Sequence, residues 1–280
     1  MASPLMVGAE GQIGRALLAA LPHAQGTTRR PSAAGQWFVD LAADESHWVL
    51  PASVSEAYLC AAITALEACR QDPTASAFVN VTQTVKLAQR LIALGAFIVF
   101  LSTNLVFDGS HPRRLATEPP CPTTEYGRQK AEAERALESL GEAVAIVRLT
   151  KVITPNMALL ARWRAALEQG QTIRPFSDLV MAPLPLPFVV QALTRIGARR
   201  HGGVFQLSGE RDITYAEAAE WLAARLGANP KLVQPITSVE AGVALEAIPA
   251  HTTLDDTRAR QMFGLQPPSS ADTLEFVAKP

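Results

Sequence analysis

The sequence predicts an α/β protein, with a doubly wound parallel sheet and a smaller C-terminal lobe. Two observations carry this prediction. Residues 96–101 and 144–149 are continuous apolar runs of strand length, as expected for parallel strands that helices cover on both faces. Residues 77–94, directly before the first run, place apolar side chains at the spacing of an amphipathic helix. Strands that alternate with helices along a chain favour a parallel sheet.

Composition narrows the class of protein. The chain has 280 residues, 48% of them hydrophobic, enough to bury the core of one large domain or two smaller ones. Its formal net charge of -1 gives no electrostatic argument for a nucleic-acid partner or an anionic membrane surface. No apolar run approaches the roughly 18 residues that a membrane span needs. The three cysteines lack metal-ligand spacing, so we interpret them as reduced thiols in the cytoplasm and expect no metal site.

A glycine-rich turn links the first predicted strand, which ends at residue 7, to the first predicted helix. Its spacing is Gly-x-x-Gly-x-x-Gly, not the commoner Gly-x-Gly-x-x-Gly. Glycines at such a junction let the backbone approach a pyrophosphate at a helix N-terminus, where free amide groups favour negative charge. The alternative is a flexible turn. The candidate nucleotide-binding residues of this turn are Gly8, Gly11, Gln12, Ile13 and Gly14.

The next two predicted strands, residues 23–28 and 37–41, end in charged residues. In a doubly wound sheet these ends face the adenosine ribose, where an arginine accommodates a 2′-phosphate and an acidic residue binds a 2′-hydroxyl. Arg29 and Arg30 therefore favour NADP(H) over NAD(H), although an ordinary basic turn explains them as well. Asp40 either accepts a hydrogen bond from the adenine amino group or caps the next turn.

Four further residues extend the candidate cofactor surface. The fourth predicted strand, residues 54–62, ends in Ala61 and Ala62, whose small side chains allow close passage of a cofactor or simply pack well. Leu41 lies at the end of the third strand. Asn80 is a polar residue in an apolar helical setting, so it is either a satisfied core group or a brace for the site.

A tyrosine and a lysine stand four residues apart at the start of the helix predicted to run to residue 140. Tyr126 and Lys130 share one helix face, so the ammonium can lie beside the phenol and favour its ionised form. Such a pair can transfer a proton. The same spacing also occurs in a solvated helix start, and this interpretation stays open from the pair alone.

Three motifs in order resemble the extended short-chain dehydrogenase/reductases, and within them the dTDP-4-dehydrorhamnose reductase-like branch. The motifs are the glycine turn, Ser-Thr-Asn-Leu-Val-Phe-Asp-Gly at residues 102–109, and Tyr-Gly-Arg-Gln-Lys-Ala-Glu at residues 126–132, which Pro122 precedes. The ordered motifs cover residues 1–150, and a looser similarity extends to the C-terminus. The branch's usual signature differs here at Asn104 and Leu105.

The resemblance implies a hydride-transfer site. Thr103 would bind the substrate carbonyl, Tyr126 would donate a proton, and Lys130 would hold the cofactor ribose and lower the tyrosine pKa. The implied cofactor contacts also include Ser102 and Val152, and the implied substrate contacts are Asn104 and Arg174. A surface ion pair is the alternative for the arginine.

Departures from the family patterns narrow the expected reaction. Sister dehydratases place an Asp-Glu pair directly after the catalytic threonine, where this chain has Asn104-Leu105, so dehydration is disfavoured. Epimerase-reductases carry an additional cysteine and histidine pair, whereas Cys121 lies in a proline-rich loop. We expect NADPH-dependent reduction of a keto group on a nucleotide-activated 4-keto-6-deoxysugar. The alternatives are a non-catalytic nucleotide-binding or regulatory protein on the same fold, and a sugar-nucleotide 4-epimerase.

The implied organisation is an NAD(P)-binding Rossmann domain at residues 1–152 and mainly a substrate-binding lobe at residues 153–280. The sequence leaves open whether a segment around residues 185–208 returns to the main sheet. The remaining predicted elements are helices at 159–168, 188–196 and 214–226 and a strand at 204–209. The expected partner is a nucleotide sugar, and we expect no nucleic-acid or membrane partner. The sequence leaves open whether the protein forms a homodimer.

Overall fold

The computed structural model describes residues 2–30, 37–154, 157–243 and 245–278. A seven-stranded sheet with the order β10-β6-β5-β4-β1-β2-β3 forms its centre, and all neighbouring strands in it are parallel. These strands are β1 (Ser3–Val7), β2 (Gln25–Thr28), β3 (Trp37–Phe38), β4 (Val54–Leu59), β5 (Phe97–Thr103), β6 (Val144–Leu149) and β10 (Gly203–Leu207). The predicted doubly wound parallel sheet is confirmed.

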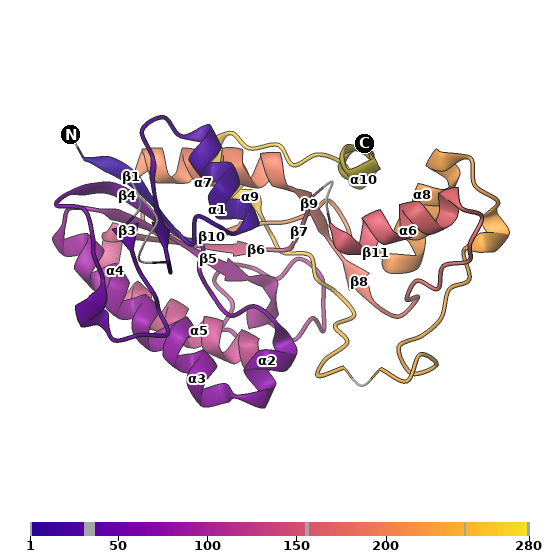
Figure 1. The fold of residues 1–280 in the computed structure, drawn as a ribbon, viewed down its shortest axis with the longest axis horizontal. Helices are drawn as coiled ribbons and strands as arrows, with labels where there is room; N and C mark the ends of the chain where they lie inside the picture. The colour runs from indigo at the N-terminus through magenta and orange to yellow at the C-terminus, as the bar shows by residue number, and fades with distance from the viewer. Residues whose placement is uncertain (1, 31–36, 155–156, 244, 279–280) are drawn as a thin grey trace.

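Helices cover both faces of the sheet (Figure 1). One face carries α1 (Gln12–Ala20), α7 (Leu186–Arg199) and α9 (Thr257–Phe263), and the other carries α2 (Leu66–Gln71), α3 (Pro73–Ala77), α4 (Thr84–Ala93) and α5 (Glu125–Glu138). Every residue of β5 is buried, and its side chains alternate between two apolar clusters, one under each helical layer. The apolar run at residues 96–101 is continuous for this reason.

The C-terminal lobe has its own apolar core. It is built from α6 (Ala158–Glu168), α8 (Tyr215–Leu226) and α10 (Ser270–Ala278), with the short strands β7 (Lys151–Ile153), β8 (Val180–Met181), β9 (Pro183–Pro185) and β11 (Ile213–Thr214). Strand β7 pairs with β9 in parallel, and α7 and β10 then bring the chain back to the main sheet. The lobe lies beyond the ends of β5 and β6, on the right in Figure 1.

Local signals explain several boundaries. Thr214 and Glu217 form the reciprocal capping box at the start of α8. Short 3-10 turns join other elements, at η1 (Glu45–His47), η3 (Asn104–Val106), η4 (Gly141–Ala143) and η5 (Pro230–Leu232). Within the described ranges, no helix combines the length and apolar character that crossing a membrane requires.

The helix predicted at residues 77–94 is interrupted. It comprises the end of α3, a π-helical segment η2 (Phe78–Gln83), and α4. The wider turn contains Asn80, whose buried carboxamide points to the loop after β4. Apolar periodicity does not reveal such an insertion, and π-helical turns often occur near functional sites.

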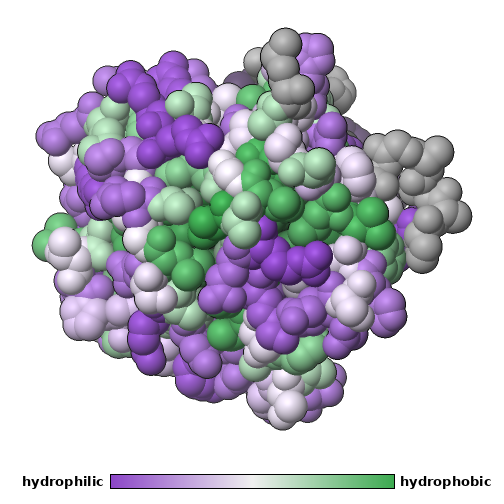
Figure 2. Space-filling model, turned by 90° about the vertical axis from the view of Figure 1, so that its left-hand side faces the viewer, coloured by the Kyte–Doolittle hydropathy of each residue, from purple (hydrophilic) through white to green (hydrophobic). Residues whose placement is uncertain are grey.

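The surface of the Rossmann part is mixed in character. Figure 2 views the end of the molecule opposite the C-terminal lobe, where hydrophilic residues cover most of the face and hydrophobic residues form a band across its middle. Two cavities lie elsewhere, around the carboxyl ends of the strands.

Candidate active site

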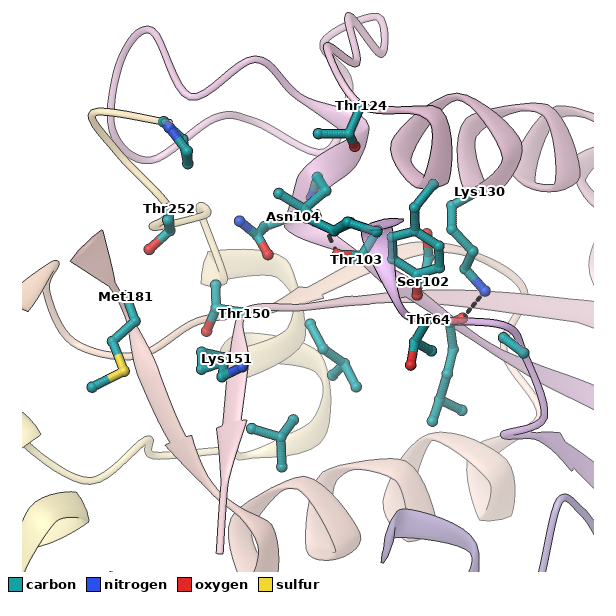
Figure 3. Close-up of a pocket in the computed structure, with 18 of the residues that line it drawn as sticks. Thr64, Ser102, Thr103, Asn104, Thr124, Lys130, Thr150, Lys151, Met181 and Thr252 are labelled. Atoms are coloured by element: carbon teal, nitrogen blue, oxygen red, sulfur yellow. Dashed lines mark hydrogen bonds between the residues drawn. The ribbon is translucent and has the colours of Figure 1, made fainter. Parts of the chain in front are cut away.

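A cavity of about 490 Å³ lies at the carboxyl ends of β5 and β6, between the sheet and the C-terminal lobe (Figure 3). Thr103, Tyr126 and Lys130 line this cavity together. The carboxyl ends of parallel strands are where doubly wound sheets bind ligands. We call this space the catalytic cavity.

The start of α5 brings Tyr126 to the cavity. Thr124 caps the helix, because its Oγ1 accepts a hydrogen bond from the Gly127 amide at 3.0 Å. A Cβ atom at Gly127 would lie 2.1 Å from the carbonyl oxygen of Leu105, so only glycine allows the helix to pack this closely on η3. This close packing places the tyrosine near the end of β5.

Thr103 is the last residue of β5 and is nearly buried. Its Oγ1 accepts a hydrogen bond from the Leu105 amide at 3.2 Å, which caps the η3 turn. Because the oxygen already serves as an acceptor, the hydroxyl proton is available to donate to a ligand in the cavity.

The glycine turn forms a second cavity of about 290 Å³, which adjoins the first because Cys60 and Ala62 line both. Gly8 has a φ of +86°, and a Cβ there would lie 2.8 Å from the Ala61 amide nitrogen. A Cβ at Gly14 would lie 2.3 Å from the Gly8 carbonyl oxygen. Glycine at these two positions therefore lets α1 pack on the end of β1 and keeps the backbone open to a ligand.

A family model for the RmlD substrate binding domain matches residues 3–279 of the chain. The chain belongs to this family. It is 28% identical to dTDP-4-dehydrorhamnose reductase of Streptomyces griseus over 274 residues, which cover 94% of this chain and 88% of the relative. It is also 36% identical to methionine adenosyltransferase 2 subunit beta of Bos taurus, over 87 residues that cover 30% of this chain and 26% of that subunit.

Solved structures share the fold of this RmlD-family protein. The dTDP-4-dehydrorhamnose reductase from Yersinia enterocolitica superposes with a TM-score of 0.84 at 18% identity, covering 99% of this chain and 100% of that one. The enzyme of the same name from Bacillus anthracis, in complex with NADP, gives 0.83 at 19% identity and 98% coverage of both chains. MoeE5 in complex with UDP-glucose and NAD gives 0.79 at 20% identity, covering 99% of this chain and 97% of that one.

The predicted site residues of this RmlD-family chain divide into three groups. Those lining the catalytic cavity are Ile13, Ser102, Thr103, Asn104, Tyr126, Lys130 and Val152, with Ala62 shared. Those lining the cavity at the glycine turn are Gly8, Gly11, Arg29, Asp40, Leu41, Ala61 and Ala62. Gln12, Gly14, Arg30, Asn80 and Arg174 line neither cavity.

Two of the residues outside both cavities have defined surroundings. The Asn80 side chain accepts from the Ile63 amide at 2.8 Å and donates to the Ile63 carbonyl at 2.9 Å and to Gln129 Oε1 at 2.8 Å. It therefore braces the loop that follows β4. Arg174 is exposed, and its nearby charge lowers the pKa of Glu240 only as a minor cause behind hydrogen bonds from Thr237.

The structure corrects the prediction that Lys130 lowers the pKa of Tyr126. The ammonium donates to the Leu101 carbonyl oxygen at 2.5 Å and lies 3.9 Å from the Phe100 ring centre. Burial raises the pKa of Tyr126, and the Cys69 thiol raises it further. The helical spacing brings the two residues to one cavity, but the lysine contacts the backbone of β5.

Burial lowers the pKa of Lys130 from its usual 10.5 to about 7, while Glu134 acts in the opposite direction. Between these two pH values the unfolded chain binds a proton that the folded chain lacks. The free energy of unfolding is therefore expected to rise with pH across this window, by up to about 1.4 kcal/mol per pH unit from this group.

Replacing Lys130 with Met is expected to remove this rise. Denaturant unfolding at several pH values across the window, with the wild type and the variant in parallel, measures the difference. Lys231→Met is a matched control because Lys231 is exposed and lines neither cavity. Parallel stability curves for the wild type and Lys130→Met would contradict the prediction.

Sequence reasoning missed a buried ionic network beside the site. Ser102 donates its hydroxyl to Glu134, and Arg148 Nη2 binds the same carboxylate at 2.7 Å. Arg148 and Glu134 are both about 3% exposed. The available signal was an arginine inside the apolar strand run at residues 144–149, since such a charge requires a partner.

Sequence reasoning also missed the residues that line the catalytic cavity on the side of the C-terminal lobe. Figure 3 shows Thr150, Lys151, Met181 and Thr252 there, opposite Ser102 and Lys130. Thr150 and Lys151 directly follow a buried strand, which is the usual place for ligand-binding residues in this class of sheet. Met181 and Thr252 come from distant segments and carried no signal. The described residues contain no group of three or more His, Cys, Asp or Glu side chains placed to hold a metal ion.

Proposed function

We propose that this protein reduces the keto group of a nucleotide-activated 4-keto-6-deoxysugar, with NADPH as the reductant. The observation that carries the proposal is that Thr103, Tyr126 and Lys130 surround one cavity, which adjoins the cavity at the glycine turn. The relatives named dTDP-4-dehydrorhamnose reductase, and the similar structure in complex with NADP, support the same reaction.

The residues at the glycine turn fit a dinucleotide. The open backbone at Gly8 and Gly11 would hold its pyrophosphate at the start of α1, and Arg29 would face the adenosine end. When bound, the cofactor supplies the hydride. Asp40 and Leu41 line the same cavity and would contact the adenine, while Val152 lines the catalytic cavity and would contact the nicotinamide.

The side chains around the catalytic cavity would supply the rest of the chemistry. The Thr103 hydroxyl donates a hydrogen bond to the substrate carbonyl oxygen and orients it. Because burial raises the pKa of Tyr126, its phenol keeps its proton at neutral pH and can donate it to that oxygen as the alcohol forms. Lys130 holds the cofactor ribose, and Asn104 contacts the sugar.

The test is an assay of NADPH oxidation with dTDP-4-keto-6-deoxyglucose and its UDP counterpart, combined with product analysis. Loss of NADPH in proportion to the deoxysugar alcohol formed is the expected result. A protein that binds NADPH but oxidises none with any keto-sugar nucleotide would favour a non-catalytic role, to which Asn104-Leu105 and the partial match to an adenosyltransferase subunit point. Exchange of sugar epimers without net oxidation would favour an epimerase.

The preference for NADPH is expected to depend on Arg29. Arg29→Ser should raise the KM for NADPH about tenfold and change the KM for NADH little, because the guanidinium contributes a charge-assisted bond to the 2′-phosphate alone. Arg30→Ser is the matched control, since Arg30 follows directly but lines neither cavity. Steady-state kinetics with both cofactors measures the difference. Equal loss of affinity for both cofactors in Arg29→Ser would contradict this assignment.

Three broader proposals follow from the same reasoning. Residues 1–152 would bind the cofactor and residues 153–280 mainly the substrate, with Arg174 as a candidate diphosphate contact from the lobe. The three free cysteines, Cys60, Cys69 and Cys121, favour the cytoplasm. The homodimer stays a prediction.

A further inference from the structure

The catalytic cavity has an unusual balance of charge. Of the described residues that line it, Lys130 and Lys151 are the only ones with basic side chains, and none is Asp, Glu, Arg or His. The other polar groups are hydroxyls and one carboxamide, on Thr64, Ser102, Thr103, Asn104, Thr124, Tyr126, Thr150, Tyr215 and Thr252, with the Cys60 thiol. A cavity with two basic side chains and no carboxylate favours an anionic occupant.

The two lysines differ in what they contact. Lys130 is buried and binds the Leu101 carbonyl. No hydrogen bond or ion pair joins the Lys151 side chain to another residue in the described part of the chain. Water reaches its side chain from the cavity, yet enough protein surrounds the ammonium that desolvation lowers its pKa. Lys151 is exposed to the water of the cavity, so its ammonium is free to pair with an anionic group of a ligand that displaces this water.

The position of Lys151 is fixed close to the reacting end of the cavity. Thr103 and Leu149 are direct neighbours in the β5–β6 register, and Lys151 comes two residues after Leu149. Lys151 then pairs with Pro183 as β7 enters the C-terminal lobe. In Figure 3 it lies beside Thr150, on the same side as Met181 and Thr252. A ligand that reaches from Thr103 toward the lobe would pass this ammonium.

We propose that Lys151 binds an anionic oxygen group of the sugar nucleotide, so that the site selects a substrate with negative charge near the reacting sugar. The proposal rests on the proposed function for the identity of the ligand. Two sources have this chemistry: a carboxylate on the sugar and the diphosphate of the nucleotide. Lys151 and its neighbour Thr150 together offer donors to either oxyanion.

Binding of unreactive nucleotide sugars tests the proposal without turnover. Calorimetric titration of UDP-glucuronic acid and UDP-glucose, without cofactor, into the wild type and Lys151→Met gives the dissociation constants. Loss of a charge-assisted bond should weaken binding roughly tenfold to a hundredfold, and Lys151→Arg should retain most of the affinity. Lys231→Met removes an exposed charge in the same way and should bind like the wild type. Lys151→Gln serves if the methionine variant does not fold.

The two ligands separate the sources of the anion. Weaker binding of UDP-glucuronic acid alone would assign Lys151 to a sugar carboxylate, and equal weakening for both ligands would assign it to the diphosphate. Unchanged affinity for both ligands in Lys151→Met, or a wild type that binds neither, would overturn the proposal. Because no turnover is measured, a failure of the proposed reduction would appear separately in the NADPH assay.

Discussion

Tyr126→Phe is expected to lower kcat for keto-sugar reduction by about a hundredfold to ten-thousandfold while NADPH binding stays close to that of the wild type. In the proposed reaction the phenol, which lines the cavity with Thr103, is the proton donor, and general acid catalysis contributes effects of about this size. The missing hydroxyl should affect the chemical step much more than the packing of the ring, which is buried at the start of α5.

Steady-state kinetics and fluorescence titration with NADPH measure the two quantities. Tyr58→Phe is the matched control: Tyr58 is buried in the core and lines neither cavity, and its hydroxyl has no hydrogen-bond partner among the described residues. It should keep full activity. Retained turnover in Tyr126→Phe would rule out the tyrosine as the proton donor and remove the main support for the proposed reaction.

Arg148→Met is expected to lower the free energy of unfolding by about 3–5 kcal/mol, because it leaves a buried carboxylate without its counter-charge. Glu134 Oε2 lies 2.7 Å from Arg148 Nη2, and both side chains are almost completely buried. The Ser102 hydroxyl alone cannot neutralise this carboxylate. Denaturant unfolding of the two proteins under identical conditions measures the difference.

Two variants show whether burial is the cause. Replacing both partners, Glu134→Leu with Arg148→Met, should recover much of the lost stability, since the double variant contains no unpaired buried charge. Arg70→Met breaks the exposed pair with Glu67 and should leave stability nearly unchanged. Equal losses in the double variant and in Arg148→Met would show that packing, not charge, is responsible.

Much of the fold followed from local patterns. The apolar runs at residues 96–101 and 144–149 predicted the strands and the parallel sheet, which the strand order confirms. Three motifs in order predicted the family, which the family match confirms. The strand predicted at residues 54–62 ends at Leu59, and the one at 37–41 ends at Phe38. Composition and spacing predict whether a segment is a strand or a helix better than they predict the residue at which it ends. The end of a strand depends on which neighbouring strand is available for pairing.

The candidate site was predictable where its residues are close in sequence. The strand β5 ends at Thr103, and the next α-helix, α5, contains Tyr126 and Lys130. The order of the motifs along the chain therefore predicted that these residues line one cavity. The family resemblance also implied Arg174 as a substrate contact, and the structure places it outside the catalytic cavity. Thr252 was not selected, although its hydroxyl and amide bind Asp212 and fix it in the cavity wall.

By itself the sequence determined the alternation of strands and helices, the glycine turn and the spacing of Tyr126 and Lys130, because these depend on side chains a few residues apart. Tertiary structure alone decided the electrostatics. It buried Lys130 against the Leu101 carbonyl, enclosed Glu134 with Arg148, and left the Lys151 side chain in the cavity without a hydrogen bond or ion pair among the described residues. A pKa or the cost of a charge depends on which atoms replace water around it, and those atoms come from every part of the chain.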